Sequence, residues 1–551
     1  MRKLLALAFS ALCVFSPITQ AMNDTELKAI VEQRLLGDRS GACFAVAVIE
    51  KTVSRATVCA NPKDVKRISA QSAFEIGSVT KTMTSALLAD LILQGKASLD
   101  DPLASYLPAG TFVPMFEGKP ILLKHLVTHT SGLPVVPDFS TAKSADNPYA
   151  EIDDASLLKT LSGAKLLRAP GAQYEYSNYA MMLLSSLIAK RAGVDFETLL
   201  QTRLFAPVGM PNSYINQKPK TVLAAQGHTP NHQPTSAWNF STNAAGVGGV
   251  RATLDDMVAY VSAQLGLSQS AISPALKLTQ QEIKLAANTK MAMNWSLAPL
   301  DNHWVHIHEG GTGGFSSFVA FDLQTQRGVV VLSDTAMTSV GGLSSVGNHL
   351  LDERLPLGKA HKIAIPSAEL LRAIIGQYEF SPGMQMTLTE NAGRLFVQAT
   401  GQQAFEMGYD DNGDFYPLAF DAVLRAKQRT DGGYLLVFMQ GGGAVPLRKI
   451  EIGALAKPVV ASLSAEQLAE YSGMYPLMPN FALKVFAENG QLMAQASGQG
   501  AFALDSAGKD VFSASAFGIE IRFTRGEDGK VSGLRLLQAG NEMKGSKQPG
   551  L

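Results

Sequence analysis

A serine and a lysine lie three positions apart at the start of a strongly apolar segment. The stretch Gly77-Ser78-Val-Thr-Lys81 precedes apolar residues that recur at helical spacing, namely Met83, Leu87, Leu88, Leu91 and Ile92. Residues three apart share one helical face, so the serine hydroxyl and the lysine amine are neighbours. The positive end of the helix dipole disfavours an ammonium there, and a neutral lysine can take the serine proton. The pair predicts Ser78 as a nucleophile and Lys81 as its general base.

The same spacing recurs elsewhere, so spacing alone does not identify the nucleophile. Four more Ser-x-x-Lys patterns occur, at Ser140/Lys143, Ser156/Lys159, Ser162/Lys165 and Ser506/Lys509. We interpret these four as exposed helix or loop positions, because short motifs carry a false-positive risk. Ser78 differs because it follows the segment Phe-Glu-Ile-Gly and lies at the start of a long apolar helix.

A tyrosine and an asparagine form the second candidate group. Tyr176-Ser-Asn178 follows Pro170-Gly171 and lies just before an expected helix over residues 180–191. A tyrosine hydroxyl can relay a proton, and an asparagine amide can bind a substrate carbonyl or orient a lysine. The similar Tyr214-Ile-Asn216 lies in a polar loop and is interpreted as a turn.

A histidine followed by glycines forms the third group. In His308-Glu309-Gly310-Gly311 the glycines give a ligand close access to the backbone at the end of an expected strand. His303, His306 and His308 are also enough, by number, to bind a metal. Because no acidic or cysteine ligand pattern accompanies them, we expect no metal site.

In the first 355 residues, expected strands at both ends enclose a mostly helical middle, and these elements must position the three groups. Hydrophobic periodicity predicts helices over residues 79–94, 154–161, 180–191, 196–204, 254–265 and 346–355, and strands over 44–49, 53–58, 304–308, 315–321 and 328–332. The simplest arrangement is one sheet built from both chain ends, with helices on its faces. Long loops over residues 134–147 and 226–245, the second with Trp238, are expected to act as walls or lids.

The N-terminus predicts export, which bears on the cysteines. Arg2 and Lys3, an apolar run and a small-residue site at Ala21 predict a signal peptide over residues 1–21 and a periplasmic or secreted protein. The run is shorter than the roughly 20 residues that span a bilayer, although a retained anchor is the alternative. In an oxidising compartment Cys43 and Cys59, symmetric about a hairpin turn, are expected to form a disulfide; two free thiols are the alternative.

The composition excludes several other classes of protein. Of 551 residues, 46% are hydrophobic and 17% charged, with 47 Lys+Arg against 47 Asp+Glu. This balance, without a run of five like charges, predicts no nucleic-acid partner, and no later stretch is long enough for stable membrane insertion. Three cysteines in all exclude a disulfide-framework fold.

The C-terminal part contains an internal repeat with a constant offset of 97 residues. Gly376-Gln-Tyr378 matches Gly473-Met-Tyr475, and the glycine-bounded segment of residues 393–401 matches that of residues 490–498. Each copy has short alternating strands, which predicts two small antiparallel barrels or sandwiches. The copies are either spacers or a surface that limits access of substrate to the active site.

The three motifs in this order resemble the penicillin-recognising serine hydrolases, which include class C β-lactamases, D-alanyl-D-alanine carboxypeptidases, D-aminopeptidases and esterases. The resemblance covers about residues 25–355. It includes Leu99-Asp-Asp-Pro102, the Leu-Val-Thr-His-Thr-Ser-Gly-Leu-Pro stretch at 126–134, Val208-Gly-Met210 and Gly246-Val-Gly-Gly-Val250. The C-terminal repeats resemble lipocalin-like barrels attached to some members.

The resemblance implies a fold and a domain order. The fold class is α+β, an antiparallel sheet flanked by helices, followed by two all-β barrels. The expected domains are the signal peptide (1–21), the hydrolase domain (22–358) and the two barrels (359–455 and 456–551).

The resemblance also implies roles for the motif residues. Ser78 would be acylated, Lys81 would be the base and Tyr176 would pass the proton to the leaving group. Asn178, His308, Gly310 and Gly311 would contact substrate, with the N–H groups of Ser78 and Gly311 as the oxyanion hole. No metal or organic cofactor is implied.

The implied activity is cleavage of an amide, peptide or ester bond in a small-molecule or peptide substrate. The alternatives are a true class C-like β-lactamase and a non-catalytic penicillin or peptidoglycan binder. Glu309 departs from the family, which has Thr or Ser at this position. A carboxylate there would repel the carboxylate of β-lactams, so Glu309 is a candidate specificity residue and a poor β-lactamase is expected. The alternative is that Glu309 points away and has no role.

Overall fold

The computed structural model describes residues 21–548, apart from residues 141–142, 145–146, 286–288, 382–383, 401, 421, 431, 441–442, 451–463, 479–480, 489, 497–500, 515–518 and 539–540. The predicted signal segment up to residue 20 lies outside this range. The chain divides into two compact units, the first ending at Ala360 and the second starting at His361. The predicted boundary between the two barrels, at residues 455 and 456, falls outside the described residues.

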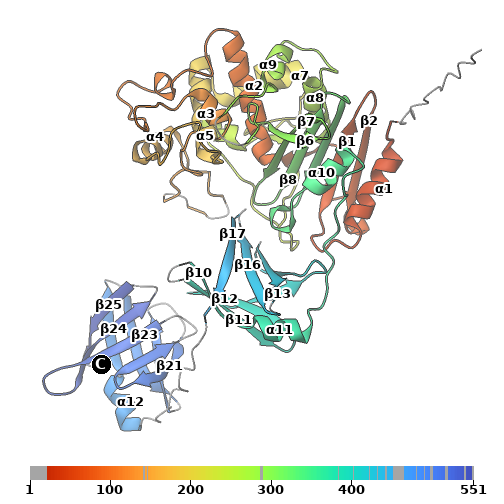
Figure 1. Ribbon diagram of the computed structural model, residues 1–551. Helices are drawn as coiled ribbons and strands as arrows, with labels where there is room; N and C mark the ends of the chain where they lie inside the picture. Colours follow the sequence, from red (N-terminus) through yellow and green to blue (C-terminus); the bar gives the residue numbers. More distant parts are fainter. Residues whose placement is uncertain are drawn as a thin grey trace, which may run out of the picture. The chain divides into compact units, whose positions relative to one another are not determined.

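Six antiparallel strands from both ends of the first unit form its central sheet (Figure 1). Their order is β2-β1-β9-β8-β7-β6. The bounds are β1 (Cys43–Ile49), β2 (Val53–Cys59), β6 (Ser296–Leu300), β7 (His303–Gly311), β8 (Ser316–Asp322) and β9 (Arg327–Ser333). The prediction of one sheet built from both chain ends, in an α+β fold, is confirmed.

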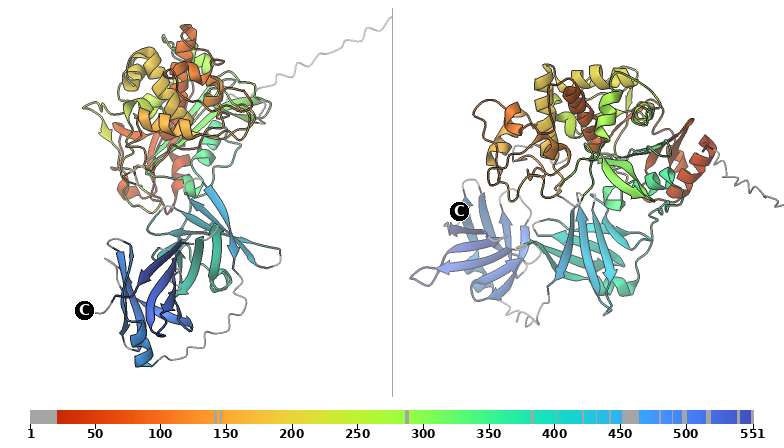
Figure 2. Two further views of the ribbon diagram at one scale, coloured as in Figure 1. Left: turned by 90° about the vertical axis from the view of Figure 1, so that its left-hand side faces the viewer. Right: turned by 45° about the horizontal axis from the view of Figure 1, so that its top comes forward.

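Side chains on these strands alternate between two apolar cores. On β1, Phe44, Val46 and Val48 belong to one cluster, whereas Ala45 and Ala47 belong to the other. The first cluster packs against α1 (Asp24–Leu35) and α10 (Ser344–Leu351), and the second against α2 (Thr80–Leu93), α5 (Asn178–Ala192), α8 (Leu254–Gln264) and α9 (Ser273–Thr279). The sheet therefore lies between two layers of helices, as Figures 1 and 2 show.

Short elements connect this framework. The remaining helices of the first unit are α3 (Leu123–Val127), α4 (Asp154–Gly163), α6 (Phe196–Leu200) and α7 (Ala206–Val208). A π-helical turn, Gln201–Phe205, interrupts the helix predicted over residues 196–204. A small second sheet, absent from the sequence prediction, has the order β4-β3-β5 and consists of β3 (Ser72–Glu75), β4 (Leu223–Ala224) and β5 (Arg251–Ala252).

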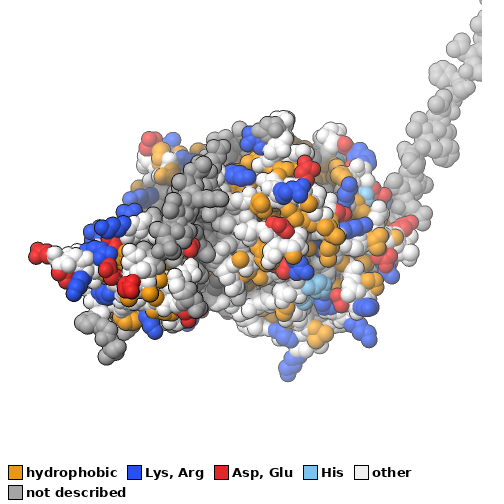
Figure 3. Space-filling model, turned by 90° about the horizontal axis from the view of Figure 1, so that it is seen from below, with side chains coloured by type: hydrophobic (Ala, Val, Ile, Leu, Met, Phe, Trp, Pro, Cys, Tyr) orange, Lys and Arg blue, Asp and Glu red, His pale blue; other side chains and the backbone are white. Residues whose placement is uncertain are grey.

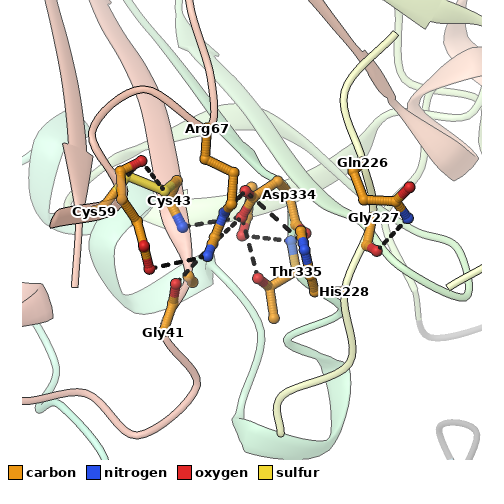
Figure 4. Close-up of polar contacts among 12 residues, drawn as sticks. Gly41, Cys43, Cys59, Arg67, Gln226, Gly227, His228, Asp334 and Thr335 are labelled. Atoms are coloured by element: carbon orange, nitrogen blue, oxygen red, sulfur yellow. Dashed lines mark hydrogen bonds and ion pairs between the residues drawn. A yellow bond between two sulfur atoms is a disulfide. The ribbon is translucent and has the colours of Figure 1, made fainter. Parts of the chain in front are cut away.

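The β1–β2 hairpin carries the two cysteines considered above. Cys43 lies directly opposite Cys59, and a disulfide joins them. Beside it, Arg67 donates to both carboxylate oxygens of Asp334, at 2.6 and 3.0 Å, and to the carbonyl of Gly41 at 2.7 Å (Figure 4). Asp334 also accepts from the backbone N–H of Cys43 at 2.9 Å. The bond from Cys43 ties the hairpin to Asp334, just after the end of β9, and Arg67 joins the segment that follows the hairpin to the same carboxylate.

The second unit contains two eight-stranded antiparallel domains, each preceded by a short helix (Figure 2). The first domain is a closed barrel, in which β10 pairs with β17. It comprises α11 (Ala368–Ile374), β10 (Gly376–Ser381), β11 (Met384–Asn391), β12 (Arg394–Ala399), β13 (Phe405–Tyr409), β14 (Asp414–Pro417), β15 (Val423–Gln428), β16 (Tyr434–Gln440) and β17 (Gly443–Lys449).

The second domain is nearly closed, because Gln548 donates its backbone N–H to the carbonyl of Met474 on β18 at 2.8 Å. It comprises α12 (Ala465–Tyr471), β18 (Gly473–Met478), β19 (Phe481–Glu488), β20 (Gln491–Ala496), β21 (Ala501–Gly508), β22 (Val511–Ala514), β23 (Ile519–Arg525), β24 (Val531–Gln538) and β25 (Asn541–Ser546).

The two barrels repeat one local contact. Tyr378 donates its hydroxyl to the carbonyl of Ile374 at 2.8 Å, and Tyr475 donates to that of Tyr471 at 2.7 Å. In each barrel the tyrosine of the first strand binds the last turn of the preceding helix. The contact is the structural counterpart of the repeat found in the sequence.

Charges of both signs are distributed over the surface. Lys and Arg side chains are mixed with Asp and Glu side chains over the face seen in Figure 3. Among the residues that the structure describes, no helix has both the length and the apolar composition needed to cross a bilayer.

Candidate active site

Ser78 lies in the 3₁₀ turn Gly77–Val79, directly before α2. Gly77 has a φ of +49°, which glycine adopts without strain, and an added Cβ would lie 2.6 Å from the backbone nitrogen of Gly311 on β7. The close approach of turn and strand brings the Ser78 and Gly311 backbones together. This juxtaposition is what an oxyanion hole built from their two N–H groups needs.

Lys81 has no exposed surface, and its amine contacts the serine. Its Nζ lies 2.8 Å from Ser78 Oγ and donates to the carbonyl of Val247 at 2.7 Å. Burial holds the pKa of Lys81 well below the ordinary lysine value, because the charged form would lose its hydration. A neutral amine can accept the proton of the adjacent hydroxyl, so the geometry suits a general base.

Tyr176 contacts the same hydroxyl from another segment. Its hydroxyl donates to Ser78 Oγ at 2.6 Å, and Lys81 Nζ lies 5.0 Å from the centre of its ring. Burial raises the pKa of Tyr176 above its usual range, so the phenol keeps its proton at neutral pH. The phenol can therefore donate a proton, which is the function expected of a relay to the leaving group.

Asn178 is the first residue of α5, next to the N-cap Ser177. Its Nδ2 donates to the hydroxyl of Tyr149 at 3.1 Å, while its buried Oδ1 has no partner among the described residues. An unpartnered buried amide oxygen is costly unless a ligand pairs with it. The position therefore suits substrate binding.

His308 lies on β7, on the face of the sheet toward α2. Its Nδ1 lies 2.6 Å from the carbonyl of Asn294 and so carries the ring proton. Burial, and next the nearby Lys81, lower the pKa of His308 to about 3. The imidazole is therefore neutral at physiological pH.

Gly310 and Gly311 let β7 approach the nucleophile. An added Cβ on Gly310 would lie 2.1 Å from the carbonyl oxygen of Ile76. A pocket beside Ser78 is lined by small, polar and aromatic residues, namely Gly77, Tyr149, Asn178, Trp238, Phe240, Val247, Gly248, Gly311 and Thr312. The structure thus brings together Ser78, Lys81, Tyr176, Asn178, His308, Gly310 and Gly311 from the three sequence motifs.

Glu309 does not join them. Strand alternation places it on the opposite face of β7 from His308, together with Val305 of the α1/α10 cluster. There its carboxylate lies beside Gly342, near the start of α10, and lines a separate hollow. Direct repulsion of a substrate carboxylate by Glu309 therefore has no geometric basis.

The other histidines of β7 are engaged elsewhere. His303 lies 2.9 Å from Asp322, and His306 Nε2 lies 2.9 Å from the carbonyl of Gln280. With His308 bound to Asn294, each of the three has its own protein partner. They do not converge on one point.

A separate group of possible metal ligands lies in the first barrel. His361, Asp410 and Asp414 bring ligand atoms within 4.8 Å of one another. Arg425 donates to both carboxylate oxygens of Asp414, at 2.6 and 2.5 Å. Its guanidinium therefore already neutralises one of the two carboxylates.

Several residues of the site escaped the sequence analysis. Tyr149 and Phe240 stack at 5.1 Å, and Trp238 lies 5.3 Å from Tyr149. The only sequence signal was the expectation that the loop over residues 226–245 acts as a wall. His129 lies in the Leu126–Pro134 stretch, which carried the family resemblance without any role being assigned to the histidine.

Comparison with known proteins identifies the family of the first unit. The sequence profile of the beta-lactamase family matches residues 27–341, which is more than half of the chain. The chain belongs to the beta-lactamase family. A β-lactamase-like α+β domain is therefore followed by two antiparallel barrels, and members of this family are serine hydrolases. The profile of a domain of unknown function (DUF3471) matches residues 457–549, in the second barrel.

Relatives in the family carry two kinds of name. The D-alanyl-D-alanine-carboxypeptidase/endopeptidase AmpH of Escherichia coli K12 is 30% identical over 338 residues, which cover 57% of this chain and 85% of AmpH. A beta-lactamase of the same strain is 28% identical over 373 residues, covering 60% and 93%. The structure of a class C beta-lactamase mutant aligns with a TM-score of 0.52 at 20% identity, covers 60% of this chain and 99% of that one, and supports the fold alone.

Proposed function

We propose that this protein is an exported serine hydrolase that cleaves an amide, peptide or ester bond through an acyl-enzyme on Ser78. The observation that carries the proposal is the position of Ser78 Oγ, 2.8 Å from the buried Lys81 Nζ and 2.6 Å from the Tyr176 hydroxyl. A neutral base and a protonated donor on one hydroxyl are what nucleophilic catalysis requires.

The reaction follows from these contacts. Ser78 Oγ attacks the substrate carbonyl carbon while its proton passes to Lys81. The N–H groups of Ser78 and Gly311 stabilise the oxyanion, and one such donor is typically worth about 10²–10³ in rate. Tyr176 then protonates the leaving group and recovers a proton from Lys81. Water attacks the acyl-enzyme by the same route in reverse and releases the acid and free Ser78.

The charge of the pocket favours neutral substrates. None of the described residues that line it has a charged side chain, and His308 is neutral. Arg251, the cation behind Trp238, is buried and donates to Glu75 at 3.2 Å and to the carbonyl of Trp238 at 2.7 Å. Since the described lining offers no cation to pair with a substrate carboxylate, we propose that the enzyme prefers esters or amides without an adjacent carboxylate, as a D-amino-acid peptidase or esterase, and hydrolyses β-lactams poorly.

Active-site labelling tests the nucleophile. A fluorescent fluorophosphonate is expected to label the mature protein and to leave Ser78→Ala unlabelled. Ser156→Ala is the matched control, because Ser156 belongs to a Ser-x-x-Lys pattern at the exposed start of α4. Labelling that survives Ser78→Ala would refute the assignment.

A substrate panel tests the preference. p-Nitrophenyl esters and D-amino-acid amides are expected to turn over faster than D-alanyl-D-alanine peptides and nitrocefin. Because a 28%-identical relative is named a beta-lactamase, β-lactam hydrolysis is the second candidate function. Nitrocefin as the best substrate, with activity lost in Ser78→Ala, would replace the first candidate by the second.

A further inference from the structure

His129 is a fully buried histidine in the loop after α3, next to Tyr176. Its φ is +54°, a conformation that is uncommon for residues other than glycine. Such backbone strain persists only where the surroundings over-determine it, and it often occurs at functional sites. The proposed reaction gives this residue no role.

Three contacts join His129 to the tyrosine segment. Its carbonyl accepts from the backbone N–H of Glu175 at 2.7 Å, and its Nδ1 accepts from the backbone N–H of Ser177 at 3.2 Å. These are the two residues that flank Tyr176. The imidazole also packs on the phenol ring, with 4.4 Å between ring centres and 34° between planes. One residue therefore holds Tyr176 by the backbone on both sides and by its ring.

The protonation state of the imidazole fits this arrangement. Because Nδ1 accepts a hydrogen bond, the ring proton of neutral His129 lies on Nε2. Burial holds the pKa of His129 well below its usual value, because the charged imidazole would lose its hydration. A neutral ring keeps Nδ1 available as an acceptor at physiological pH.

Asn294 connects this residue to the third motif. Its backbone N–H donates to the carbonyl of Val127 at 2.8 Å, at the end of α3, and its carbonyl accepts from His308 at 2.6 Å. Asn294 also has a positive φ, of +59°. The loop that holds the tyrosine is thus fixed to the strand that carries His308.

We propose that His129 is a positioning residue, which holds the Tyr176 hydroxyl at hydrogen-bonding distance from Ser78 Oγ. The proposal rests on the proposed function, since it assumes that the phenol takes part in turnover. His129 does not contact the serine hydroxyl itself and acts through Tyr176. The start of α5 holds the segment from the other side, because the Ser177 hydroxyl donates to the carbonyl of Pro134 at 2.6 Å, but this contact does not reach the phenol ring.

Two substitutions separate the hydrogen bond that Nδ1 of His129 accepts from the packing of its ring on Tyr176. His129→Asn keeps an acceptor at the position of Nδ1 and tolerates a positive φ, but it removes the ring. His129→Ala removes both. The control is His125→Asn, because His125 is also buried at α3 and also accepts a backbone N–H on Nδ1, from Leu122 at 3.0 Å, without contacting Tyr176 in the structure.

The readout is the separation of kcat from KM for a p-nitrophenyl ester, measured well below the melting temperature of each variant. A phenol displaced by about 1 Å is expected to lower kcat about 100-fold in His129→Ala, with KM unchanged. His129→Asn is expected to recover part of this loss, and His125→Asn is expected to keep the wild-type kcat. If His129→Ala does not fold, the test is the comparison of His129→Asn with His125→Asn. The proposal then predicts a lower kcat for His129→Asn than for His125→Asn.

The outcomes that overturn the proposal are distinct from those that overturn the function. Wild-type kcat in the folded His129 variants, with Ser78→Ala inactive, would refute the positioning role and leave the nucleophile standing. An equal loss of kcat in His125→Asn would show a general effect of loosening α3 and would also refute it. Turnover by Ser78→Ala would refute the proposed function instead.

Discussion

Replacing Lys81 by methionine is expected to abolish turnover and to remove a pH dependence from the stability of the fold. Lys81 is fully buried, and burial lowers its pKa well below 10.5. In the unfolded chain the same side chain is protonated at neutral pH. At a pH between the lowered pKa and 10.5, folding must therefore release a proton, which costs free energy, and methionine fills a similar volume without that cost.

The sign and size follow from proton linkage. Between the lowered pKa and 10.5 the unfolded wild type binds one more proton than the folded protein, so its stability rises with pH, about tenfold in the unfolding equilibrium per pH unit. Lys81→Met lacks this contribution, so its stability relative to the wild type is highest at the lower end of the window and falls as pH rises. Over two pH units, the difference in free energy of unfolding between Lys81→Met and wild type changes by about 3 kcal/mol. The variant also loses the hydrogen bonds of Lys81 to Ser78 and Val247, which contribute about 1 kcal/mol each, so the pH-dependent change is the larger effect.

Urea unfolding followed by tryptophan fluorescence measures this difference. All three tryptophans, Trp238, Trp295 and Trp304, lie in the first unit, so the signal reports the domain that contains Lys81. The matched control is Lys159→Met on α4, whose side chain is 69% exposed and so keeps most of its hydration in the folded protein. A difference between Lys81→Met and wild type that stays constant across the window would mean that Lys81 keeps its proton in the fold, and the general-base assignment would then fail.

Three further results are expected. Tyr176→Phe should lower kcat for an ester by about 10²–10³ while Ser78 is still labelled slowly, and an unchanged kcat would remove the tyrosine from the mechanism. Replacing Cys43 and Cys59 by serine opens a link between residues 16 apart in sequence and should cost about 3 kcal/mol of stability; a melting temperature that does not fall would count against it. Glu309→Gln should leave the ratio of ester to nitrocefin turnover unchanged, and a large gain in nitrocefin turnover would return this residue to the substrate site.

The sequence predicted the candidate site as a set of types and spacings. The contact between Ser78 and Lys81 could be predicted from their spacing, because residues three apart at the start of a helix are neighbours, and the long apolar helix that follows distinguished this pair from the four other Ser-x-x-Lys patterns. The contact of Tyr176 with Ser78 joins residues far apart in the chain, and it was expected only from the family resemblance. The loop that carries Trp238 and Phe240 was expected to be a wall, but its contact with Tyr149 and the position of His129 beside Tyr176 gave no local signal, since both depend on loops that fold against each other.

The sequence by itself determined the order of the motifs, the 97-residue repeat and the positions of the strands. The order and the repeat are properties of the linear chain, and the strands follow from local patterns that neighbouring residues set among themselves. Tertiary packing decided how far the lysine amine is buried and which face of β7 carries Glu309. Burial and facing depend on what covers each element, and the pKa of Lys81 is lowered because other parts of the chain exclude water from its amine.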